Sequence, residues 1–586
     1  MNAKQNPSAA ILHDSPVRSR ESDQFWGSDA FAAMLRELDM PYIALNPGAS
    51  YRGLHDSIVN HLGNRAPQML LSIHDENAVS IAQGYWKASD RMMAAALHSN
   101  VGLMHATMSV FDAWCDRAPV LILGATGPWD AAKRRPWIDW IHTCSDQAAL
   151  IRGYTKWDNQ PGSVEAGLEA MLRASQIAQT APRGPVYVNL DAALQEQKIG
   201  PMPALPDVKR YAAPEAVMPS AELVARAAKL LSGAKNPVML AGRCLRSLEG
   251  WKQRVALAEK LNMRVFTGMK LGAAFPTDHR LHVSPPANRF APEALKILAE
   301  ADVILSLDWL DLAGMLKQIY GVKPVTAKII QVSCDQHNHR GWSMDYQALP
   351  PIDLYLMCEP EAAVPMLLEA CQARTAPAPD KPTFKVPPVS ADELSMSGVA
   401  HALTAATKGM AVCYTHLPIG WSGAYSRFNH PLDYLGAEGG GGVGAGPGIT
   451  VGAALALNGS GRLPVGVLGD GDFLMGNTAV WTATHYKIPC LVVVCNNRSF
   501  FNDERHQERV AQERSRPPEN RWIGMRIGDP DIDIAAMSRS MGATGVGPVT
   551  KASELRKSID QAVETVAKGG VCVVDARVLP GYDADG

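Results

Sequence analysis

The residues of this sequence best suited to bind a metal ion are a carboxylate and a carboxamide that each follow an apolar run. Asp470 lies in a Gly-Asp-Gly triplet at 469–471, and Asn497 ends an Asn-Asn pair that follows after 24 residues, 472–495. Mg²⁺ takes about six oxygen ligands and usually shares them with substrate phosphates. Asp470, the Asn497 side chain and the backbone carbonyl of Ser499 would supply three. The spacing therefore predicts a magnesium site that also holds a diphosphate, with two unrelated turns as the alternative.

A glycine-rich segment at 436–448 is the second candidate binding element. Eight of its thirteen residues are glycine, and it leads directly into the apolar helix predicted for 449–457. Glycine lets backbone N–H groups approach a phosphate at the N-terminus of a helix. The segment lacks the GK[ST] of a Walker A loop and the GxGxxG spacing of a dinucleotide site. It therefore favours a diphosphate cradle over an ATP or NAD site, with a flexible linker as the alternative.

Two residues of the first third of the chain are candidates for acid–base chemistry. Glu76 begins a predicted helix directly after the apolar run 68–73, and that helix is predicted to close at Gly84-Tyr85. A carboxylate in a first helical turn often serves only the helix dipole. His98 ends the run 93–98, and an imidazole titrates near neutrality and can act as acid and base in turn. The alternative for His98 is a hydrogen-bonded structural histidine.

Three parallel sheets must position these side chains, because short apolar runs alternate with longer amphipathic stretches along the whole chain. The runs that predict strands form three sets of four: 42–46, 68–73, 93–98 and 119–124; 237–242, 264–268, 302–308 and 328–333; 411–415, 464–469, 490–495 and 571–578. Polar, Pro-containing stretches at 196–219 and 371–390 read as linkers between the sets. The predicted fold class is α/β, with three doubly wound parallel-sheet domains at 24–195, 205–370 and 390–586 after a disordered tail, 1–23.

The strand ends indicate where the chemistry lies, because ligands bind beyond the carboxyl ends of the strands in open parallel sheets. Polar residues follow the runs of the first and third sets, whereas the middle set ends in Gly242, Gly268 and Asp308. We therefore expect the chemistry in the first and third domains and a mainly architectural middle domain.

Composition excludes several classes of protein. The chain has 586 residues, of which 47% are hydrophobic and 19% charged, so it is not a disordered protein. Its net charge of −2 gives no global field for nucleic acid or an anionic membrane. The absence of a membrane-length apolar run or a signal peptide favours a cytoplasmic location. The ten cysteines lack zinc-site spacing, which predicts reduced and mostly buried thiols.

Taken together, the motifs resemble those of thiamine-diphosphate-dependent enzymes of the acetolactate synthase, benzoylformate decarboxylase and pyruvate decarboxylase group. The Gly-Asp-Gly to Asn-Asn spacing, Glu76 and the segment Asn46-Pro47-Gly48 carry the resemblance, which extends in colinear order over about residues 24–580. It implies pyrimidine-binding, middle and diphosphate-binding domains in this order. It also implies a homodimer with shared sites, expected within a homotetramer. Because 267–282 is similar to a segment of nucleotide-binding relatives, FAD or an ADP-type nucleotide in the middle domain is a further expectation.

The resemblance also implies roles for individual residues. Glu76 would stabilise the imino tautomer of the aminopyrimidine, and His98, in a Leu-His-Ser sequence, would relay protons. Val443 would be the apolar wedge under the cofactor, and the Gly441 carbonyl would accept from the aminopyrimidine. The implied metal ligands are Asp470, Asn497 and Ser499. The implied cofactor-binding set is Asn46, Pro47, Gly48, Glu76, His416, Gly441, Val443, Gly469, Asp470, Gly471, Asp472 and Asn497, although residue chemistry alone favours structural roles for His74, His105 and His416.

The implied function is that of a carbon–carbon lyase or carboligase dependent on thiamine diphosphate and Mg²⁺. A 2-keto acid would lose CO₂ to give an enamine, which is protonated to an aldehyde or ligated to an aldehyde or keto acceptor. The segment 99–106 and the pair Gly124-Ala125 depart from the acetolactate synthase pattern, which argues against the branched-chain biosynthetic enzyme. Open alternatives are a 2-hydroxyacyl-CoA lyase, an oxalyl-CoA-type decarboxylase, a nucleotide-binding oxidoreductase and a non-catalytic regulatory subunit. The last would have no need of Glu76.

Overall fold

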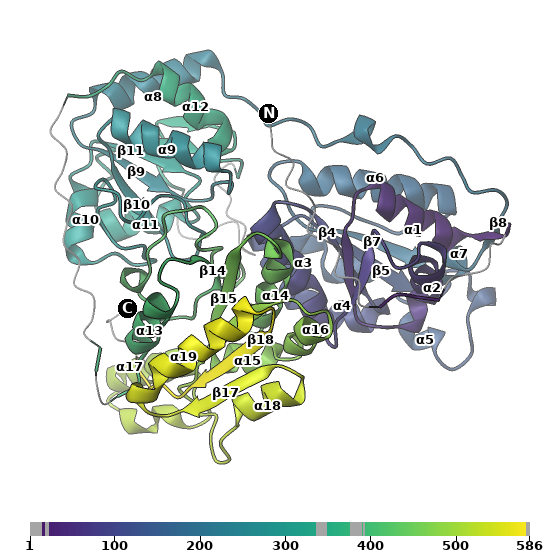
Figure 1. The fold of residues 1–586 in the computed structure, drawn as a ribbon. Helices are drawn as coiled ribbons and strands as arrows, with labels where there is room; N and C mark the ends of the chain where they lie inside the picture. The colour runs from purple at the N-terminus through teal and green to yellow at the C-terminus, as the bar shows by residue number, and fades with distance from the viewer. Residues whose placement is uncertain (1–13, 18–22, 336–348, 376–388, 391–392, 582–586) are drawn as a thin grey trace.

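Three parallel β-sheets, one in each third of the chain, form the framework of the molecule (Figure 1). The computed structural model describes residues 14–17, 23–335, 349–375, 389–390 and 393–581. In Figure 1 the N-terminal domain is purple to blue, the middle domain teal and the C-terminal domain green to yellow. The predicted α/β class with three parallel-sheet domains is confirmed.

The N-terminal domain is built on six parallel strands in the order β3-β2-β4-β5-β7-β6. Its strands are β2 (Tyr42–Leu45), β3 (Gln68–Leu71), β4 (Met93–Leu97), β5 (Val120–Thr126), β6 (Asp158–Asn159) and β7 (Val186–Asp191). Its helices are α1 (Gly27–Glu37), α2 (Arg52–Asp56), α3 (Asp75–Ser89), α4 (Ser99–Cys115), α5 (Asp139–His142), α6 (Val164–Gln179) and α7 (Ala192–Gln195). A short antiparallel pair, β1 (Phe25–Trp26) and β8 (Lys198–Ile199), joins the two ends of this domain.

The middle domain has five parallel strands in the order β10-β9-β11-β12-β13. They are β9 (Pro237–Ala241), β10 (Arg264–Thr267), β11 (Val303–Leu307), β12 (Lys328–Val332) and β13 (Leu354–Leu356). The helices of this domain are α8 (Ala221–Gly233), α9 (Leu248–Lys260), α10 (Pro292–Ala299), α11 (Leu312–Tyr320) and α12 (Pro360–Ala370). Separate apolar clusters cover the two faces of the sheet, as expected for a parallel sheet between helical layers.

The C-terminal domain also has five parallel strands, in the order β14-β15-β16-β18-β17. They are β14 (Ala411–His416), β15 (Arg462–Gly469), β16 (Cys490–Cys495), β17 (Thr544–Val549) and β18 (Val571–Ala576). Its helices are α13 (Met396–Ala406), α14 (Gly446–Leu457), α15 (Asp470–Gly476), α16 (Ala479–His485), α17 (Phe501–Glu513), α18 (Ile534–Ser540) and α19 (Ala552–Ala567).

All twelve apolar runs form strands, and the strands that were not predicted are β1, β6, β7, β8, β13 and β17. Most of these have two or three residues, and β17 contains two glycines and a proline, which weaken a strand pattern. The predicted domain boundaries stay predictions. Of the predicted tail, 1–23, the structure describes residues 14–17 and 23, and the other residues lie outside the described part of the chain. All ten cysteines are free and seven are buried.

Helices α3 and α14 cross in direct backbone contact and join the N-terminal to the C-terminal domain (Figure 1). A Cβ on Gly84 would lie 2.2 Å from the Ile449 carbonyl oxygen, and a Cβ on Gly452 would lie 1.9 Å from that of Ile81. One apolar core continues through this crossing from one domain to the other. The crossing therefore sets the position of the first turn of α3, which carries Glu76, relative to the C-terminal domain.

The prediction that Gly84-Tyr85 closes α3 is wrong. The helix continues to Ser89 and ends at Asp90, which has a left-handed φ of 55°. Gly84 is required by the close approach of α14 rather than by a helix C-cap. Within the described parts of the chain, no helix is both long and apolar enough to cross a membrane.

Candidate functional site

The carboxyl ends of β15 and β16 bring Asp470 and Asn497 together, as their spacing predicts. The Ser499 N–H donates to both side chains, at 3.1 Å to Asp470 Oδ2 and 2.9 Å to Asn497 Oδ1. The other carboxylate oxygen of Asp470 accepts the Gly471 N–H at 2.9 Å. Two side-chain oxygens that share one donor lie close enough together to bind one cation, and the Ser499 carbonyl belongs to the same turn.

Burial disfavours the ionised form of the Asp470 carboxyl group, which a nearby positive charge would stabilise. It raises the pKa of Asp470 to about 6, although several backbone N–H donors, including those of Gly471 and Ser499, act in the opposite direction. A divalent cation would supply that charge, so these residues fit Mg²⁺. Among the residues that the structure describes, no group of three or more His, Cys, Asp or Glu side chains could hold a metal. The proposed site does not conflict with that result, because only one of its three ligands, Asp470, is a carboxylate, and the other two are a carboxamide and a backbone carbonyl.

Most of the predicted cofactor residues of the C-terminal domain line a single cleft. They are His416, Val443, Gly469, Asp470, Gly471, Asp472, Asn497 and Ser499. Val443 is 37% exposed, so an apolar side chain is available in the cleft. Phe500 and Phe501 also line it, and a Cβ on Gly471 would lie 2.6 Å from the Phe500 ring. The charged stretch after Phe500 forms helix α17.

The glycine-rich segment packs against helix α4 of the N-terminal domain. A Cβ on Gly440 would lie 2.6 Å from Asp112 Oδ1, and one on Gly442 would lie 2.5 Å from the Met108 side chain. The Gly440 N–H donates to Asp112 Oδ1 at 2.8 Å. Close packing between two domains therefore accounts for these glycines, where the sequence suggested the approach of a phosphate.

Asp472 holds the second half of the same segment. Its Oδ1 accepts the Gly444 N–H at 2.7 Å and the Gly446 N–H at 3.2 Å. Carboxylates thus take glycine N–H groups that we expected to face a diphosphate. Gly441, with a left-handed φ of 74°, has no atom within 4 Å of its Cβ position. The segment is therefore open at Gly441, next to the residues that α4 and Asp472 hold.

His416 is a buried cation of the cleft. Its Nε2 lies 2.5 Å from Glu438 Oε2, and its Nδ1 lies 3.9 Å from Asp472 Oδ2. Burial by itself would lower the pKa of His416, but the Glu438 carboxylate outweighs it and raises that pKa to about 9. Burial would likewise raise the pKa of Glu438, yet His416 brings it below its ordinary value. The pair is therefore ionised at neutral pH.

Glu76 approaches the glycine-rich segment from the N-terminal domain of the same chain. Its Oε1 lies 3.7 Å from the Cβ position of Gly444, and its side chain is 16% exposed. Burial, and then the nearby charge of Asp472, raise the pKa of Glu76. A carboxyl group with a raised pKa can share its proton with a hydrogen-bonding partner instead of losing it to water.

His98 lies at the end of β4, directly against Gly48. A Cβ on Gly48 would lie 2.0 Å from the imidazole ring, so only glycine leaves room for it. Ser50 Oγ lies 2.9 Å from His98 Nδ1, and the His142 ring meets the imidazole edge-on with centroids 4.8 Å apart. Burial, followed by His142 and Arg135, lowers the pKa of His98 to about 4. The imidazole is therefore neutral at pH 7.

The remaining predicted residues of this edge have structural partners. Asn46 Nδ2 donates to the Ser72 carbonyl at 3.1 Å, which links the ends of β2 and β3 next to Pro47. His74 accepts the Glu76 N–H at 3.3 Å and stacks on His105 with ring centroids 5.3 Å apart. These contacts agree with the structural roles favoured for both histidines.

Several residues of the site were missed in the sequence. Ser50 lies two positions after Gly48, so the predicted strand-end motif could have led to it. His142 lies on α5 and Asp112 in the middle of α4. No spacing in the sequence connects either residue with the motif that it contacts.

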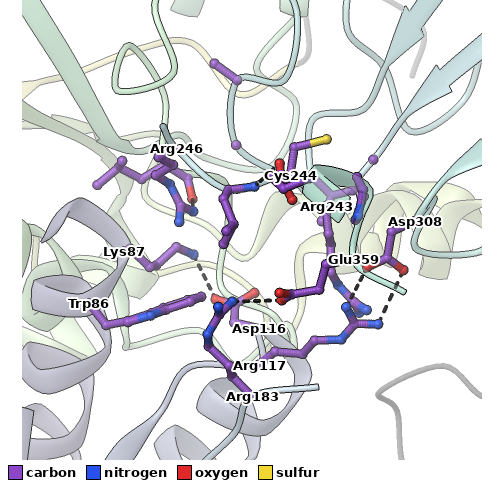
Figure 2. Close-up of a pocket in the computed structure, with 18 of the residues that line it drawn as sticks. Trp86, Lys87, Asp116, Arg117, Arg183, Arg243, Cys244, Arg246, Asp308 and Glu359 are labelled. Carbon is purple, nitrogen blue, oxygen red and sulfur yellow. Dashed lines mark hydrogen bonds and ion pairs between the residues drawn. The ribbon is translucent and has the colours of Figure 1, made fainter. Parts of the chain in front are cut away.

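A pocket at the strand ends of the middle domain is where a nucleotide was expected (Figure 2). Some of its basic side chains are paired with carboxylates: Arg117 pairs with Asp308 at 2.5 Å, and Arg183 pairs with Glu359 at 2.8 Å. Lys87 likewise pairs with Asp116 (Figure 2). A nucleotide diphosphate would have to compete with these carboxylates. Arg246 and Lys270 also line the pocket, and Arg246 lies 4.0 Å from Asp90, so a nucleotide in the middle domain stays a prediction.

Three family models match the chain in succession. The model described as "Thiamine pyrophosphate enzyme, N-terminal TPP binding domain" matches residues 25–151. The corresponding central domain matches 224–349, and the C-terminal TPP binding domain matches 418–576. The three matches follow the order of the three sheets.

Individual relatives are similar over most of their length. Benzoylformate decarboxylase of Pseudomonas aeruginosa is 24% identical over 505 residues, which cover 84% of this chain and 89% of that protein. The acetolactate synthase large subunit of Lactococcus lactis is 23% identical over 505 residues, with 83% of each chain covered. The solved thiamine diphosphate-dependent 4-hydroxybenzoylformate decarboxylase of Rhodococcus jostii RHA1 has a TM-score of 0.77 at 20% identity, covering 95% of this chain and 100% of that one. At this identity the structural likeness concerns the fold.

Proposed function

Because this chain belongs to the thiamine-diphosphate-dependent enzyme family, we propose that it is a lyase or carboligase that acts on a 2-keto acid with thiamine diphosphate and Mg²⁺. The observation that carries the proposal is the cleft in which Asp470, Asn497 and Val443 lie together. Such a cleft offers oxygen ligands for a cation at one position and an apolar contact for an organic ring at another.

The C-terminal domain would hold the diphosphate end of the cofactor. Asp470, the Asn497 side chain and the Ser499 carbonyl are the proposed ligands of Mg²⁺, which would bridge to the phosphates. The His416 cation lies in the same cleft and would balance part of the phosphate charge. Val443 would support the cofactor, with the Gly441 carbonyl available to its aminopyrimidine.

Glu76 is the proposed proton-holding group for the pyrimidine ring. When bound, thiamine diphosphate would supply a nucleophilic carbon and an electron sink for the electron pair that remains when CO₂ leaves the substrate. The buried Glu76 carboxyl, with its raised pKa, would share a proton with a ring nitrogen of the cofactor. A solvated carboxylate would be a poorer donor at neutral pH.

His98 is the proposed proton carrier on the substrate side. Its ring is neutral at pH 7 and can therefore accept a proton, and because its pKa is lowered to about 4 the protonated ring returns that proton readily. The Ser50 hydroxyl at Nδ1 fixes the orientation of the ring, which leaves Nε2 for the reacting group. If His98 delivers its proton to the substrate carbon that has lost CO₂, the product is an aldehyde. If that proton is withheld, the same carbon would instead attack a second carbonyl compound.

The proposed assembly is a homodimer with shared sites, expected within a homotetramer. Within one chain the C-terminal domain lines the metal-side cleft and Glu76 reaches the adjoining glycine-rich segment, so a second copy would pack against a site that one chain already assembles in part. The curated relatives named above include a benzoylformate decarboxylase and an acetolactate synthase, which favours a 2-keto acid over a CoA thioester. The pocket of Figure 2 offers no independent support for a nucleotide-bearing substrate.

Calorimetry of the purified protein tests the cofactor assignment. We expect thiamine diphosphate to bind with Mg²⁺ and not with EDTA. Asp470→Ala should abolish Mg²⁺-dependent binding, and Glu76→Gln should retain binding while slowing exchange of the cofactor's C2 proton by about 10²-fold or more. Asp503→Ala, at the outer wall of the same cleft, is the matched control. Binding that does not depend on a divalent cation would refute the proposed site.

The substrate class requires a separate measurement. CO₂ release should be followed with aliphatic, aromatic and sulfonated 2-keto acids, each with and without an acceptor aldehyde. A decarboxylase releases an aldehyde without the acceptor, whereas a carboligase gives a new carbon–carbon bond only with it. Absence of CO₂ from every acid, by protein that binds the cofactor, would direct attention to the thioester alternative.

A further inference from the structure

The glycine-rich wall of the cofactor cleft is held by carboxylates from two different domains. Asp472 of the C-terminal domain accepts the N–H groups of Gly444 and Gly446. Asp112 of the N-terminal domain accepts the N–H of Gly440. Gly441 and Val443 lie between these two attachment points. The position of both residues is therefore fixed from either side.

Asp112 lies in the middle of α4 and has no exposed surface. Its Oδ1 accepts the Gly440 N–H at 2.8 Å, and the backbone N–H of Gly442 also acts on the carboxylate and lowers its pKa. Burial is the largest cause that raises the pKa of Asp112, with Glu438 and Asp116 adding to it. Keeping a carboxyl group in such a place costs free energy, which indicates that its contact with the segment has a use.

The segment needs such an anchor because of its own composition. Residues 439–442 are four consecutive glycines, and glycine loses more conformational freedom on ordering than any other residue. Gly441 has a left-handed φ and no neighbouring atoms around its Cβ position. No contact at Gly441 itself holds the turn, and the nearest attachments along the chain are those of Gly440 and Gly442 to α4.

We propose that Asp112 is a positioning residue for the cofactor: by accepting the Gly440 N–H from the opposite domain, it fixes the turn that presents the Gly441 carbonyl and Val443 to the cleft. The inference rests on the proposed function, since it takes Gly441 and Val443 as cofactor contacts. The group that it acts on is the aminopyrimidine end of thiamine diphosphate. Asp112 itself stays behind the segment and does not touch the cofactor.

Two substitutions separate the hydrogen bond from the rest of the side chain. Asp112→Ala removes the acceptor, and we expect the dissociation constant for thiamine diphosphate with Mg²⁺ to rise about tenfold or more. Asp112→Asn keeps a carbonyl oxygen at Oδ1, so it should restore binding to within about threefold of the wild type. Gly440→Ala keeps Asp112 but places a Cβ 2.6 Å from Oδ1. It should weaken binding as the alanine variant of Asp112 does.

Rescue of cofactor binding by Asp112→Asn is the readout that a merely structural role would not predict, and local hydrogen exchange in the cofactor-free protein reports whether the segment itself is held. We expect faster exchange across 438–446 in Asp112→Ala and Gly440→Ala, and near wild-type exchange in Asp112→Asn. Asp29→Ala is the matched control, because Asp29 is buried in the same domain and also accepts a backbone N–H, that of Trp26. It should leave exchange in 438–446 and cofactor affinity unchanged.

The outcomes distinguish this inference from the proposed function. If the wild-type protein does not bind thiamine diphosphate, the proposed function fails, while the exchange data still report whether Asp112 holds the segment. If the wild type binds the cofactor and both Asp112→Ala and Gly440→Ala bind it equally well with unchanged exchange, the positioning role is refuted. If Asp112→Ala does not fold, Gly440→Ala and Asp112→Asn decide the question. Equal losses in these two variants would also overturn it.

Discussion

The buried pair of His416 and Glu438 should make the stability of this protein depend on pH in a definite direction. The pKa of His416 is raised to about 9 in the folded chain, against about 6.5 for an unperturbed histidine. The groups that act on it are Glu438 and Asp472, which raise its pKa, and Lys87, which lowers it. Between about pH 6.5 and 9 the folded state therefore holds a proton on His416 that the unfolded state has already released.

The size of the effect follows from that difference. Each pKa unit corresponds to about 1.4 kcal/mol, so about 2.5 units give about 3 kcal/mol as an order of magnitude. Since the folded pKa lies above the unfolded one, this stabilisation is complete below pH 6.5. It is then lost as the pH rises through about 9, with a slope that approaches 1.4 kcal/mol per pH unit.

Urea unfolding of the cofactor-free protein between pH 6 and 9.5 measures this dependence. The double variant His416→Gln/Glu438→Gln removes both titrating groups of the pair, so the difference in unfolding free energy between wild type and variant should shrink by about 3 kcal/mol over this range. Taking the difference between the two proteins cancels the pH dependence that comes from the titration of the buried thiols, because both proteins contain them. His401→Gln, on the exposed surface of α13, is the control. A difference that stays constant from pH 6.5 to 9 would refute the argument.

Two further predictions concern the helix crossing and the substrate-side histidine. Gly452→Ala should destabilise the fold by about 3 kcal/mol in thermal or urea unfolding, because its Cβ would lie 1.9 Å from the Ile81 carbonyl oxygen. Gly233, at the end of α8, has open space around its Cβ position, so Gly233→Ala should be nearly neutral. Equal effects of the two substitutions would contradict the close crossing of α3 and α14. The pKa of His98 is lowered to about 4 in the folded chain, so the unfolded state takes up a proton first and the free energy of unfolding should fall as the pH decreases from 6.5 towards 4. His98→Gln should flatten that part of the acid-unfolding curve, and an unchanged curve would show that the imidazole is not held neutral.

The parts of the fold that could be predicted are those in which a local pattern is sufficient. Strands such as β16 (Cys-Leu-Val-Val-Val-Cys) are buried on both faces, so the run of apolar residues marks them without any tertiary information. Strand β7 (Val-Tyr-Val-Asn-Leu-Asp) carries a similar signal that was available in the sequence but not used. The polar residues that follow two neighbouring strands then meet for a geometric reason, as Asp470 and Asn497 do.

The parts that could not be predicted depend on contacts between distant segments. Gly440 and Asp112 are 328 positions apart, and each lies where local rules give another explanation: a flexible glycine run and a polar helix residue. Gly84 was taken as a helix end because glycine is common there. Its actual role appears only when α14 is placed against α3. In each case the missing information was which backbone approaches the glycine.

The glycine-rich segment therefore has a different part in the proposed mechanism from the one that its composition suggests. A phosphate cradle needs free N–H groups, but those of Gly440, Gly444 and Gly446 donate to aspartates. The segment can still serve the cofactor through the Gly441 carbonyl and Val443, whose placement requires rigid neighbours. Rigidity at a run of glycines must come from outside the run. Because one of its two anchors lies in the N-terminal domain, that domain shapes the wall of the cleft as well as supplying Glu76 and His98.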